Sequence, residues 1–293
     1  EPGRGKMPGK MPEFIIIGAA KSGTTALYEY LVEHPEVFMS PIKETNFFAW
    51  DDGCPKSIFG NKPNNHFPIK SLSKYRDIFS KAEASEVCGE ASPLYLESAT
   101  AAKQIHNSIP GVKIIAILRN PADRAFSDYC MQIRHSFTDV SIEQGLDSNS
   151  HSVKTGYYHK MLSEYYNLFP SENILILKFE DLKSNPAGQA KKLFNFLGIS
   201  DDFAPDFTKK HNAGGFPKNM FINKVLAIAS RRETMKWLTP NWLVQFIKSR
   251  REQNWENMPE FPTELRSLLV ENYMDEIDKL SQLTGLDFEA WQK

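Results

Sequence analysis

Residues 18–25, GAAKSGTT, combine a turn of small residues with one lysine. The segment lies between an apolar run at residues 14–17 and a helical pattern that begins at Thr24. A turn in this position directs backbone N–H groups and the positive end of the helix dipole at one point, where Lys21 adds a full charge. The segment therefore predicts a site for a phosphate or sulfate group. An ordinary strand-to-helix turn with a surface lysine is the alternative interpretation.

The position of the lysine distinguishes this segment from the strict nucleotide P-loop. That pattern, GxxxxGK[ST], places the lysine after its second glycine, whereas Lys21 precedes Gly23. A kinase of that class would also have a magnesium-binding acidic residue at a strand end, and the sequence offers no evident candidate.

A second segment carries a phosphate-binding combination. An apolar run at residues 112–118 ends at Arg119, a helix is expected to begin at Pro121, and Ser127 follows eight residues after the arginine. An arginine fork and the unpaired N–H groups of a helix start both suit a phosphate. In the alternative interpretation, Arg119 only pairs with a carboxylate such as Asp123.

Together the two segments resemble the donor-binding motifs of sulfotransferases that use 3′-phosphoadenosine 5′-phosphosulfate (PAPS). Lys-Ser-Gly-Thr-Thr resembles the 5′-phosphosulfate loop, and residues 114–127 resemble the segment that holds the 3′-phosphate. The resemblance covers most of residues 14–218. It implies PAPS as donor, 3′,5′-adenosine bisphosphate (PAP) as product and no metal. The implied donor contacts are Lys21, Ser22, Gly23, Thr24, Thr25, Arg119 and Ser127.

Residues 210–218 resemble the late glycine-containing loop that closes over the nucleotide in this family. The loop lacks the Arg-Lys-Gly arrangement of cytosolic members. The resemblance nevertheless implies further donor contacts, namely Asn212, Gly214, Gly215 and Lys218.

The proton acceptor has two candidates. Lys21 is the candidate for balancing the charge on the bridging oxygen of the leaving group. Residues 43–48, KETNFF, resemble the Lys-Glu-x-x-Phe-Phe segment of carbohydrate sulfotransferases, which implies Glu44 as catalytic base. Aromatic neighbours such as Phe47, Phe48 and Trp50 would desolvate Glu44 and strengthen it as a base, while Lys43 would oppose that effect. His211 is the competitor, since histidine serves as base in cytosolic members and titrates near neutral pH. In the alternative interpretation, Lys43 and Glu44 are only a charged pair on a surface loop.

Two residues are predicted to contact the acceptor. Glu90 ends the third expected strand in a segment that resembles an acceptor-facing one, so it would orient Lys21 or contact substrate; a buried ion pair is the equal alternative. Tyr158 follows Gly156 and Tyr157 in another family-like segment. For Phe179, Glu180 and Asp181, packing and helix capping are the preferred interpretation.

The elements that must position these residues alternate along the chain. Apolar runs predict strands at 14–17, 37–39, 87–88, 112–118 and 173–179, and helical patterns fill 24–34, 99–107, 121–135, 154–169 and 186–197. This alternation predicts a single α/β domain with a central, mainly parallel sheet flanked by helices, P-loop-like and of the sulfotransferase fold. Helices at 221–232, 240–251 and 263–282 would form a C-terminal cover. Residues 51–68 and 208–219 are the expected mobile loops.

Composition narrows the setting. The chain has 293 residues, a net charge of -1 and a pI near 6.8, so bulk attraction to nucleic acid or an anionic membrane is not expected, and any anion site must be local. Three cysteines make a disulfide framework improbable, which favours a reducing, cytoplasmic location. Residues 1–12 are expected to be a linker and 13–293 the sulfotransferase domain. No run approaches the roughly 20 apolar residues of a membrane span.

The acceptor is expected to be a hydroxyl group. The linker-like N-terminus and overall texture resemble sulfotransferase domains of bacterial modular polyketide and olefin synthases, which implies the β-hydroxyl of an acyl chain on an acyl carrier protein, within a larger multidomain synthase. A carbohydrate or small-molecule acceptor is the alternative. A P-loop kinase and a non-catalytic nucleotide-binding module are the alternatives from other classes.

Overall fold

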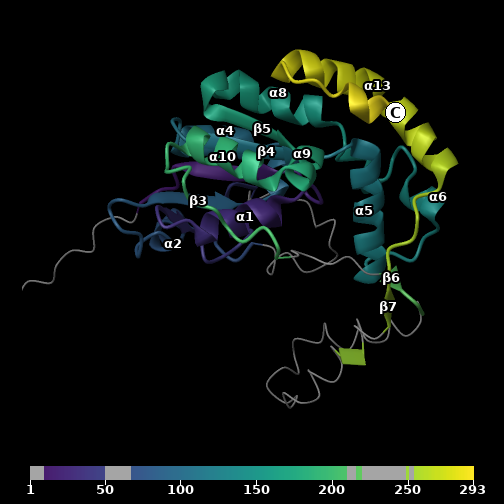
Figure 1. The fold of residues 1–293 in the computed structure, drawn as a ribbon, viewed down its shortest axis with the longest axis horizontal. Helices are drawn as coiled ribbons and strands as arrows, with labels where there is room; N and C mark the ends of the chain where they lie inside the picture. Colours follow the sequence, from purple (N-terminus) through teal and green to yellow (C-terminus); the bar gives the residue numbers. More distant parts are fainter. Residues whose placement is uncertain (1–9, 50–66, 210–215, 220–248, 251–253) are drawn as a thin grey trace, which may run out of the picture.

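The computed structural model describes residues 10–49, 67–209, 216–219, 249–250 and 254–293. At its centre lies a five-stranded sheet in the order β2-β3-β1-β4-β5, in which every pairing is parallel (Figure 1). The strands are β1 (Phe14–Gly18), β2 (Val37–Met39), β3 (Val87–Ala91), β4 (Lys113–Leu118) and β5 (Ile174–Lys178). The predicted α/β architecture is confirmed, and β3 is longer than its short apolar run suggested.

Helices cover both faces of the sheet, which explains why its strands are mostly apolar. On one face, Ile15 and Ile17 pack in a core with α4 (Ala101–Ser108), α5 (Pro121–Arg134), α8 (Tyr158–Leu168) and α13 (Thr263–Thr284). On the other, Phe14 and Ile16 pack in a second core with α1 (Thr24–Glu33) and α10 (Pro186–Leu197). The result is a three-layer α/β/α arrangement (Figure 1).

Capping residues set the helix boundaries that matter for the site. Asn120 caps α5, because its Oδ1 accepts hydrogen bonds from the N–H groups of Ala122 and Asp123, and Pro121 occupies the first turn. The helix α1 starts after Gly23, whose φ of 100° is left-handed, and ends before Pro35. Both helices thus begin directly after a strand of the sheet.

One predicted helix is interrupted. The pattern at 154–169 begins at the last residue of α7 (His151–Lys154), and after a break that contains Gly156 it continues as α8. A Cβ at Gly156 would lie 2.6 Å from the Tyr273 hydroxyl and 3.0 Å from the Pro121 Cβ, so only glycine lets α13 and α5 approach this closely.

Several short elements had no usable sequence pattern, since six residues or fewer hold too little periodicity. They are α2 (Leu72–Asp77), α3 (Leu94–Glu97), α6 (Ile142–Gly145), α9 (Phe179–Ser184), the 3-10 turns η1 (Phe47–Ala49), η3 (Ser171–Asn173) and η5 (Glu289–Gln292), and the antiparallel pair β6 (Phe216–Pro217) and β7 (Trp255–Glu256).

The C-terminal cover is confirmed in part. The predicted helix at 263–282 is α13, which packs on α5 and α8. The predicted helix at 221–232, almost all of 240–251 and most of the two predicted mobile loops lie outside the described residues. Within the described ranges, no helix is long and apolar enough to span a membrane.

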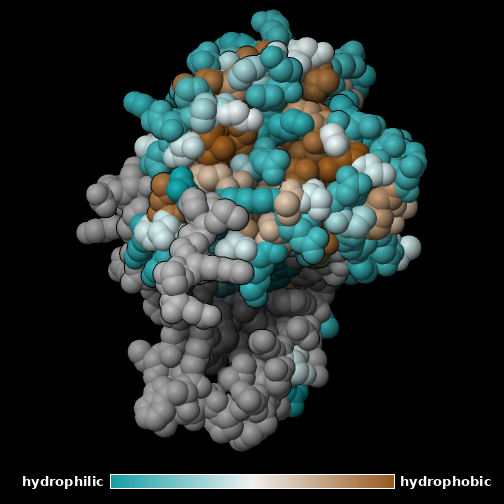
Figure 2. Space-filling model, turned by 90° about the vertical axis from the view of Figure 1, so that its left-hand side faces the viewer, coloured by the Kyte–Doolittle hydropathy of each residue, from teal (hydrophilic) through white to brown (hydrophobic). Residues whose placement is uncertain are grey.

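The described surface has no single apolar face in the view of Figure 2, where hydrophobic patches are separated by hydrophilic side chains. The large exposed hydrophobic residues come from different elements, among them Val32 of α1, Leu72 of α2 and Leu268 of α13.

Candidate functional site

The two predicted phosphate-binding segments lie side by side. Strands β1 and β4 are neighbours in the sheet, with Gly18 paired to Ala116, so the segments that follow them leave the same edge. The Arg119 guanidinium donates a hydrogen bond from Nη1 to the Lys21 carbonyl oxygen at 3.4 Å. Lys21 and Arg119 therefore belong to one site at the carboxyl end of the sheet.

The loop around Lys21 presents backbone N–H groups. Lys21 and Gly23 have φ values of 69° and 100°, which turn the chain sharply into α1. No described side chain caps this helix start, although the Ala26 N–H already donates to the Gly23 carbonyl oxygen at 3.0 Å. Ser22 and Thr24 are buried beneath the turn. This geometry would suit an anion at the helix N-terminus, beside a lysine.

Positive charge is concentrated around this loop. Burial lowers the pKa of Lys21, and Arg134, Arg119 and Arg124 lower it further, while Asp128 opposes them. Burial also lowers the pKa of Arg119. Cations that are held together away from water favour an anion as their partner.

The carboxylate that would have neutralised Arg119 is engaged elsewhere. Asp123 is held by Arg266 of α13 in a bidentate pair, with Nε–Oδ1 at 3.0 Å and Nη2–Oδ2 at 3.3 Å. Within the described part of the chain, Arg119 forms no ion pair, so the alternative interpretation of an Arg119–Asp123 pair is wrong. Ser127, half-buried, lies one helical turn beyond Asp123 on α5.

Tyr158 lies behind Arg119 and has almost no exposed surface. Its hydroxyl donates to the Arg119 carbonyl oxygen at 2.9 Å, and burial raises its pKa to about 12. In this structure Tyr158 has no surface that an acceptor could contact, in contrast to the sequence-based expectation. It fixes the backbone that carries Arg119.

The strand β5 is followed by residues that pack and cap, as expected. The Phe179 ring lies under the Arg119 guanidinium, 4.9 Å from centroid to carbon, and the Glu180 carboxylate accepts the Asn120 N–H at 3.0 Å. A Cβ at Gly23 would lie 3.0 Å from the Phe179 ring, so this ring also packs closely against the loop around Lys21.

The segment after β2 brings two further charged residues to the same edge. The Glu44 N–H donates to the Ala91 carbonyl oxygen at 3.0 Å, which ties this segment to the end of β3. The Lys43 ammonium donates to the Thr25 hydroxyl at 2.6 Å and lies 5.9 Å from the centroid of the Tyr28 ring. The sequence analysis missed Lys43 as a neighbour of the phosphate loop, because that contact joins two segments with no shared pattern.

Glu44 itself is exposed at this edge. The expected aromatic shielding is wrong for the two rings that the structure describes, because Phe47 stacks on Tyr75 at 4.5 Å and Phe48 packs on Tyr75 and Tyr95. Trp50 lies outside the described residues. The Glu44 carboxylate is thus open to solvent and to an approaching hydroxyl.

Glu90 is completely buried and is surrounded by hydroxyl groups. Thr45 and Ser92 donate to its Oε2 at 2.5 and 3.0 Å, and Tyr75 and Tyr95 donate to its Oε1 at 2.5 and 3.0 Å. Burial raises the pKa of Glu90, and these hydrogen bonds oppose the shift. Across the described ranges it has no ion-pair partner and no exposed surface, so neither sequence-based interpretation describes its contacts.

Only the end of the predicted nucleotide-closing loop, residues 216–218, belongs to the described residues. His211, Asn212, Gly214 and Gly215 lie outside the described residues. Lys218 is exposed, and its N–H donates to the Asn254 carbonyl oxygen at 2.7 Å, next to β6, which packs against α5. A role for Lys218 in donor binding remains a prediction.

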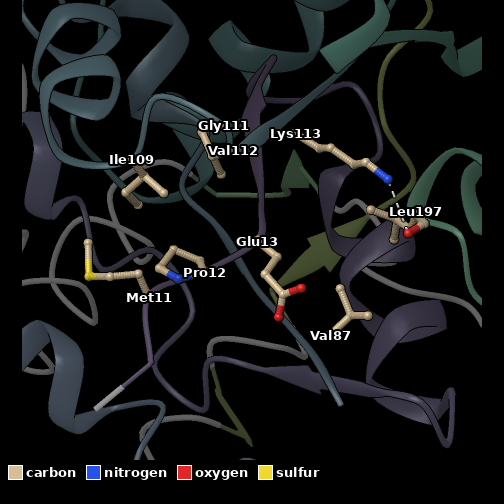
Figure 3. Close-up of a pocket in the computed structure, with 9 residues that line it drawn as sticks. All are labelled: Met11, Pro12, Glu13, Val87, Ile109, Gly111, Val112, Lys113 and Leu197. Carbon is tan, nitrogen blue, oxygen red and sulfur yellow. Dashed lines mark hydrogen bonds between the residues drawn. The ribbon is translucent and has the colours of Figure 1, made fainter. Parts of the chain in front are cut away.

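A cavity of about 360 Å³ lies at the opposite end of the strands (Figure 3). Its two charged side chains are already engaged: Lys113 donates to the carbonyl oxygens of Phe196 and Leu197 at 2.8 and 3.2 Å, and Glu13 accepts the Cys88 N–H at 3.4 Å. This cavity is therefore separate from the charged edge. Among the described residues there is no group of three or more potential metal ligands.

Comparison with known proteins agrees with this geometry. The family model described as "Sulfotransferase domain" matches residues 11–220. Heparan sulfate glucosamine 3-O-sulfotransferase 6 of Homo sapiens is 30% identical over 198 residues, which are 65% of this chain and 53% of that protein. The bifunctional heparan sulfate N-deacetylase/N-sulfotransferase 2 of Homo sapiens is 30% identical over 207 residues, 65% of this chain and 22% of that protein.

Among solved structures, a sulfotransferase from Alicyclobacillus acidocaldarius superposes with a TM-score of 0.72 at 24% identity, covering 97% of this chain and 100% of that one. This likeness supports the fold. The chain spans about half or less of the length of the curated relatives described above.

Proposed function

This chain belongs to the sulfotransferase domain family, and from that premise we propose that it transfers a sulfuryl group from PAPS to a hydroxyl group of a saccharide. The observation that carries the proposal is the adjacency of the Lys21 loop and Arg119 at one edge of the sheet, joined by a hydrogen bond at 3.4 Å.

The residues at this edge fit a nucleotide with phosphate groups at both ends. The Lys21 loop offers a helix start without a side-chain cap, and a lysine, for the 5′ end. Arg119 and Ser127 would hold the 3′-phosphate, since the Asp123 carboxylate is paired with Arg266. Asn212, Gly214, Gly215 and Lys218 are proposed to complete the donor site.

Bound PAPS would supply a sulfuryl group on a phosphosulfate anhydride. Lys21 would offset the negative charge that develops on the leaving phosphate, and Lys43, bonded to Thr25, would place a second cation beside the same helix start. Glu44, exposed at the end of β2 and β3, would take the proton from the acceptor hydroxyl. His211 is the competing base.

The saccharide acceptor is supported by two likenesses to carbohydrate sulfotransferases. The segment from Lys43 to Phe48 resembles that of carbohydrate sulfotransferases, and the relatives at 30% identity are named for heparan sulfate. The sequence predicts a different acceptor, the β-hydroxyl of an acyl chain on an acyl carrier protein, and the acceptor panel described below tests it. That residues 13–293 form the sulfotransferase domain of a larger synthase also remains a prediction.

Donor recognition is tested by calorimetry with the purified chain. We expect PAP to bind at least tenfold more tightly than 5′-AMP without divalent metal, because only PAP engages both Arg119 and the Lys21 loop. Lys21→Ala should abolish transfer to every acceptor. Tighter binding of ATP with magnesium than of PAP would instead favour a kinase.

The acceptor is tested with labelled PAPS and a panel of a heparan-type oligosaccharide, a β-hydroxyacyl carrier protein and a phenol. Preferred labelling of the oligosaccharide supports the proposal, and labelling of the carrier protein alone would replace it. Glu44→Gln and His211→Ala then identify the base, since only the variant that lacks the base should lose the rate of the chemical step.

A further inference from the structure

Glu90 lies directly beneath the loop that carries Lys43 and Glu44. We propose that Glu90 is a positioning residue, whose carboxylate gathers the hydroxyls of Thr45, Ser92, Tyr75 and Tyr95 and thereby fixes Glu44 relative to the phosphate loop. The inference rests on the proposed function, because it concerns the placement of the proposed base.

The loop needs such a support because its backbone is unfavourable by itself. Glu44 and Asn46 have φ values of 61° and 50°, in the left-handed region that side chains other than glycine rarely adopt. Such conformations persist only where the surroundings dictate them. Thr45, between these two residues, has its side chain completely buried against Glu90.

The hydrogen bonds form one directed network. The hydroxyls of Ser92 and Tyr95 donate to Glu90 and accept backbone N–H groups of the loop, from Asn46 at 3.1 Å and from Phe48 at 3.3 Å. Each hydroxyl has one proton and separate lone pairs, so it can donate to Glu90 and accept the loop N–H at the same time. A carboxylate, which only accepts, suits this arrangement of donors.

Two backbone hydrogen bonds extend the network to the sheet. The Glu44 N–H donates to Ala91 and the Ser40 N–H donates to Gly89, so both sides of Glu90 on β3 hold the segment after β2. The Lys43 ammonium meets Thr25 from the same segment. Glu90 thus connects the end of β3 to the segment that carries Lys43 and Glu44.

Thr45 offers the sharpest test, since Thr45→Val keeps the shape and removes the hydroxyl, whereas Thr45→Ser keeps the hydroxyl. We expect Thr45→Val to lower kcat on the order of tenfold or more, with the KM for PAPS within about twofold of wild type, because displacement of a reacting group slows the chemical step while Lys21 and Arg119 are untouched. Thr45→Ser should recover most of the rate.

A matched control separates position from general stability. Tyr165→Phe removes another buried hydroxyl, which donates to the Tyr95 carbonyl oxygen at 2.9 Å and does not contact Glu90. It should lower the unfolding temperature about as much as Thr45→Val, yet leave kcat within about twofold of wild type. Equal losses of kcat in both variants would overturn the proposal.

A double-mutant cycle with Glu44→Gln tests the route of action. If Thr45 acts through Glu44, Thr45→Val should change the residual rate of Glu44→Gln less than twofold. The same fold-loss in both backgrounds, or a Thr45→Ser variant as slow as Thr45→Val, would refute the positioning role. Failure of the proposed function looks different, because wild-type protein would then transfer no sulfuryl group from PAPS.

Discussion

The pair between Arg266 and Asp123 predicts that a residue of the C-terminal cover controls donor affinity. Arg266→Met removes both hydrogen bonds to Asp123 while keeping an apolar stem on α13. The Asp123 carboxylate would then be unpaired at the first turn of α5, one helical turn from Ser127 and near Arg119. Its negative charge would oppose a phosphate held by these two residues.

The magnitude follows from this spacing. Residues one turn apart have Cβ atoms about 6 Å apart, so the carboxylate would lie roughly 8 Å from a phosphate at Ser127. Because this site is partly exposed, its effective dielectric constant is about 40, higher than in a buried site. One charge on Asp123 and one on the phosphate then repel by about 1 kcal/mol, which weakens the Kd about fivefold. The half-exposed pair itself contributes only about 0.5 kcal/mol to the free energy of unfolding.

Calorimetric titration with PAP at fixed salt measures this effect. Arg266→Met should raise the Kd of PAP about fivefold but leave the Kd of 5′-AMP nearly unchanged, because 5′-AMP has no 3′-phosphate. Adding Asp123→Asn should restore PAP affinity to within about twofold, and higher salt should shrink the difference. If the double variant binds PAP as weakly as Arg266→Met, the loss comes from displacement of α13 and the electrostatic argument is wrong.

Three further predictions concern Glu97, Tyr158 and Lys43. Burial raises the pKa of Glu97 to about 7 from its ordinary value of 4.5, because it favours the neutral carboxylic acid. The contribution of Glu97 to the free energy of unfolding is therefore fully present below pH 4.5 and is lost as the pH rises through 7. Glu97→Gln should remove up to about 3 kcal/mol of that loss, measured by urea unfolding at pH 5 and pH 8; parallel losses in both proteins would contradict the assignment. Tyr158→Phe deletes the hydrogen bond to the Arg119 carbonyl and should lower the free energy of unfolding by about 1 kcal/mol and weaken PAP binding, whereas unchanged PAP affinity would separate Tyr158 from Arg119. Lys43→Met should reduce kcat without changing the ratio of PAP to 5′-AMP affinity, and a changed ratio would place Lys43 at the 3′ end instead.

The sheet and the donor edge were predictable because local patterns encode them directly. Strands covered on both faces are continuous apolar runs, and residues that follow them must emerge at the carboxyl edge. Lys21 and Arg119 could be assigned to that edge for this reason. Their direct adjacency depends on β1 pairing with β4, which follows from the fold family and not from either segment alone.

The acceptor side was less predictable because its contacts join distant segments. Glu90 follows a strand, as a site residue would, but hydroxyls from Thr45 and Tyr75 enclose it from other parts of the chain. Tyr158 is enclosed in the same way behind Arg119. Local spacing identifies polar residues near a strand end, whereas only tertiary packing decides which of them reach the surface.

The electrostatics of the donor edge explain why a chain with a net charge of -1 can present an anion site. Lys21, Arg119, Arg124 and Arg134 act on one another at the loop, and the opposing Asp128 is already bonded by Ser152 and Gln132. Holding these cations close together lowers the stability of the unliganded fold, and the same arrangement provides a preorganised field for a phosphate. Replacing Lys21 or Arg119 with a neutral residue would therefore relieve repulsion and remove donor binding together, so stability and activity are opposed at this edge.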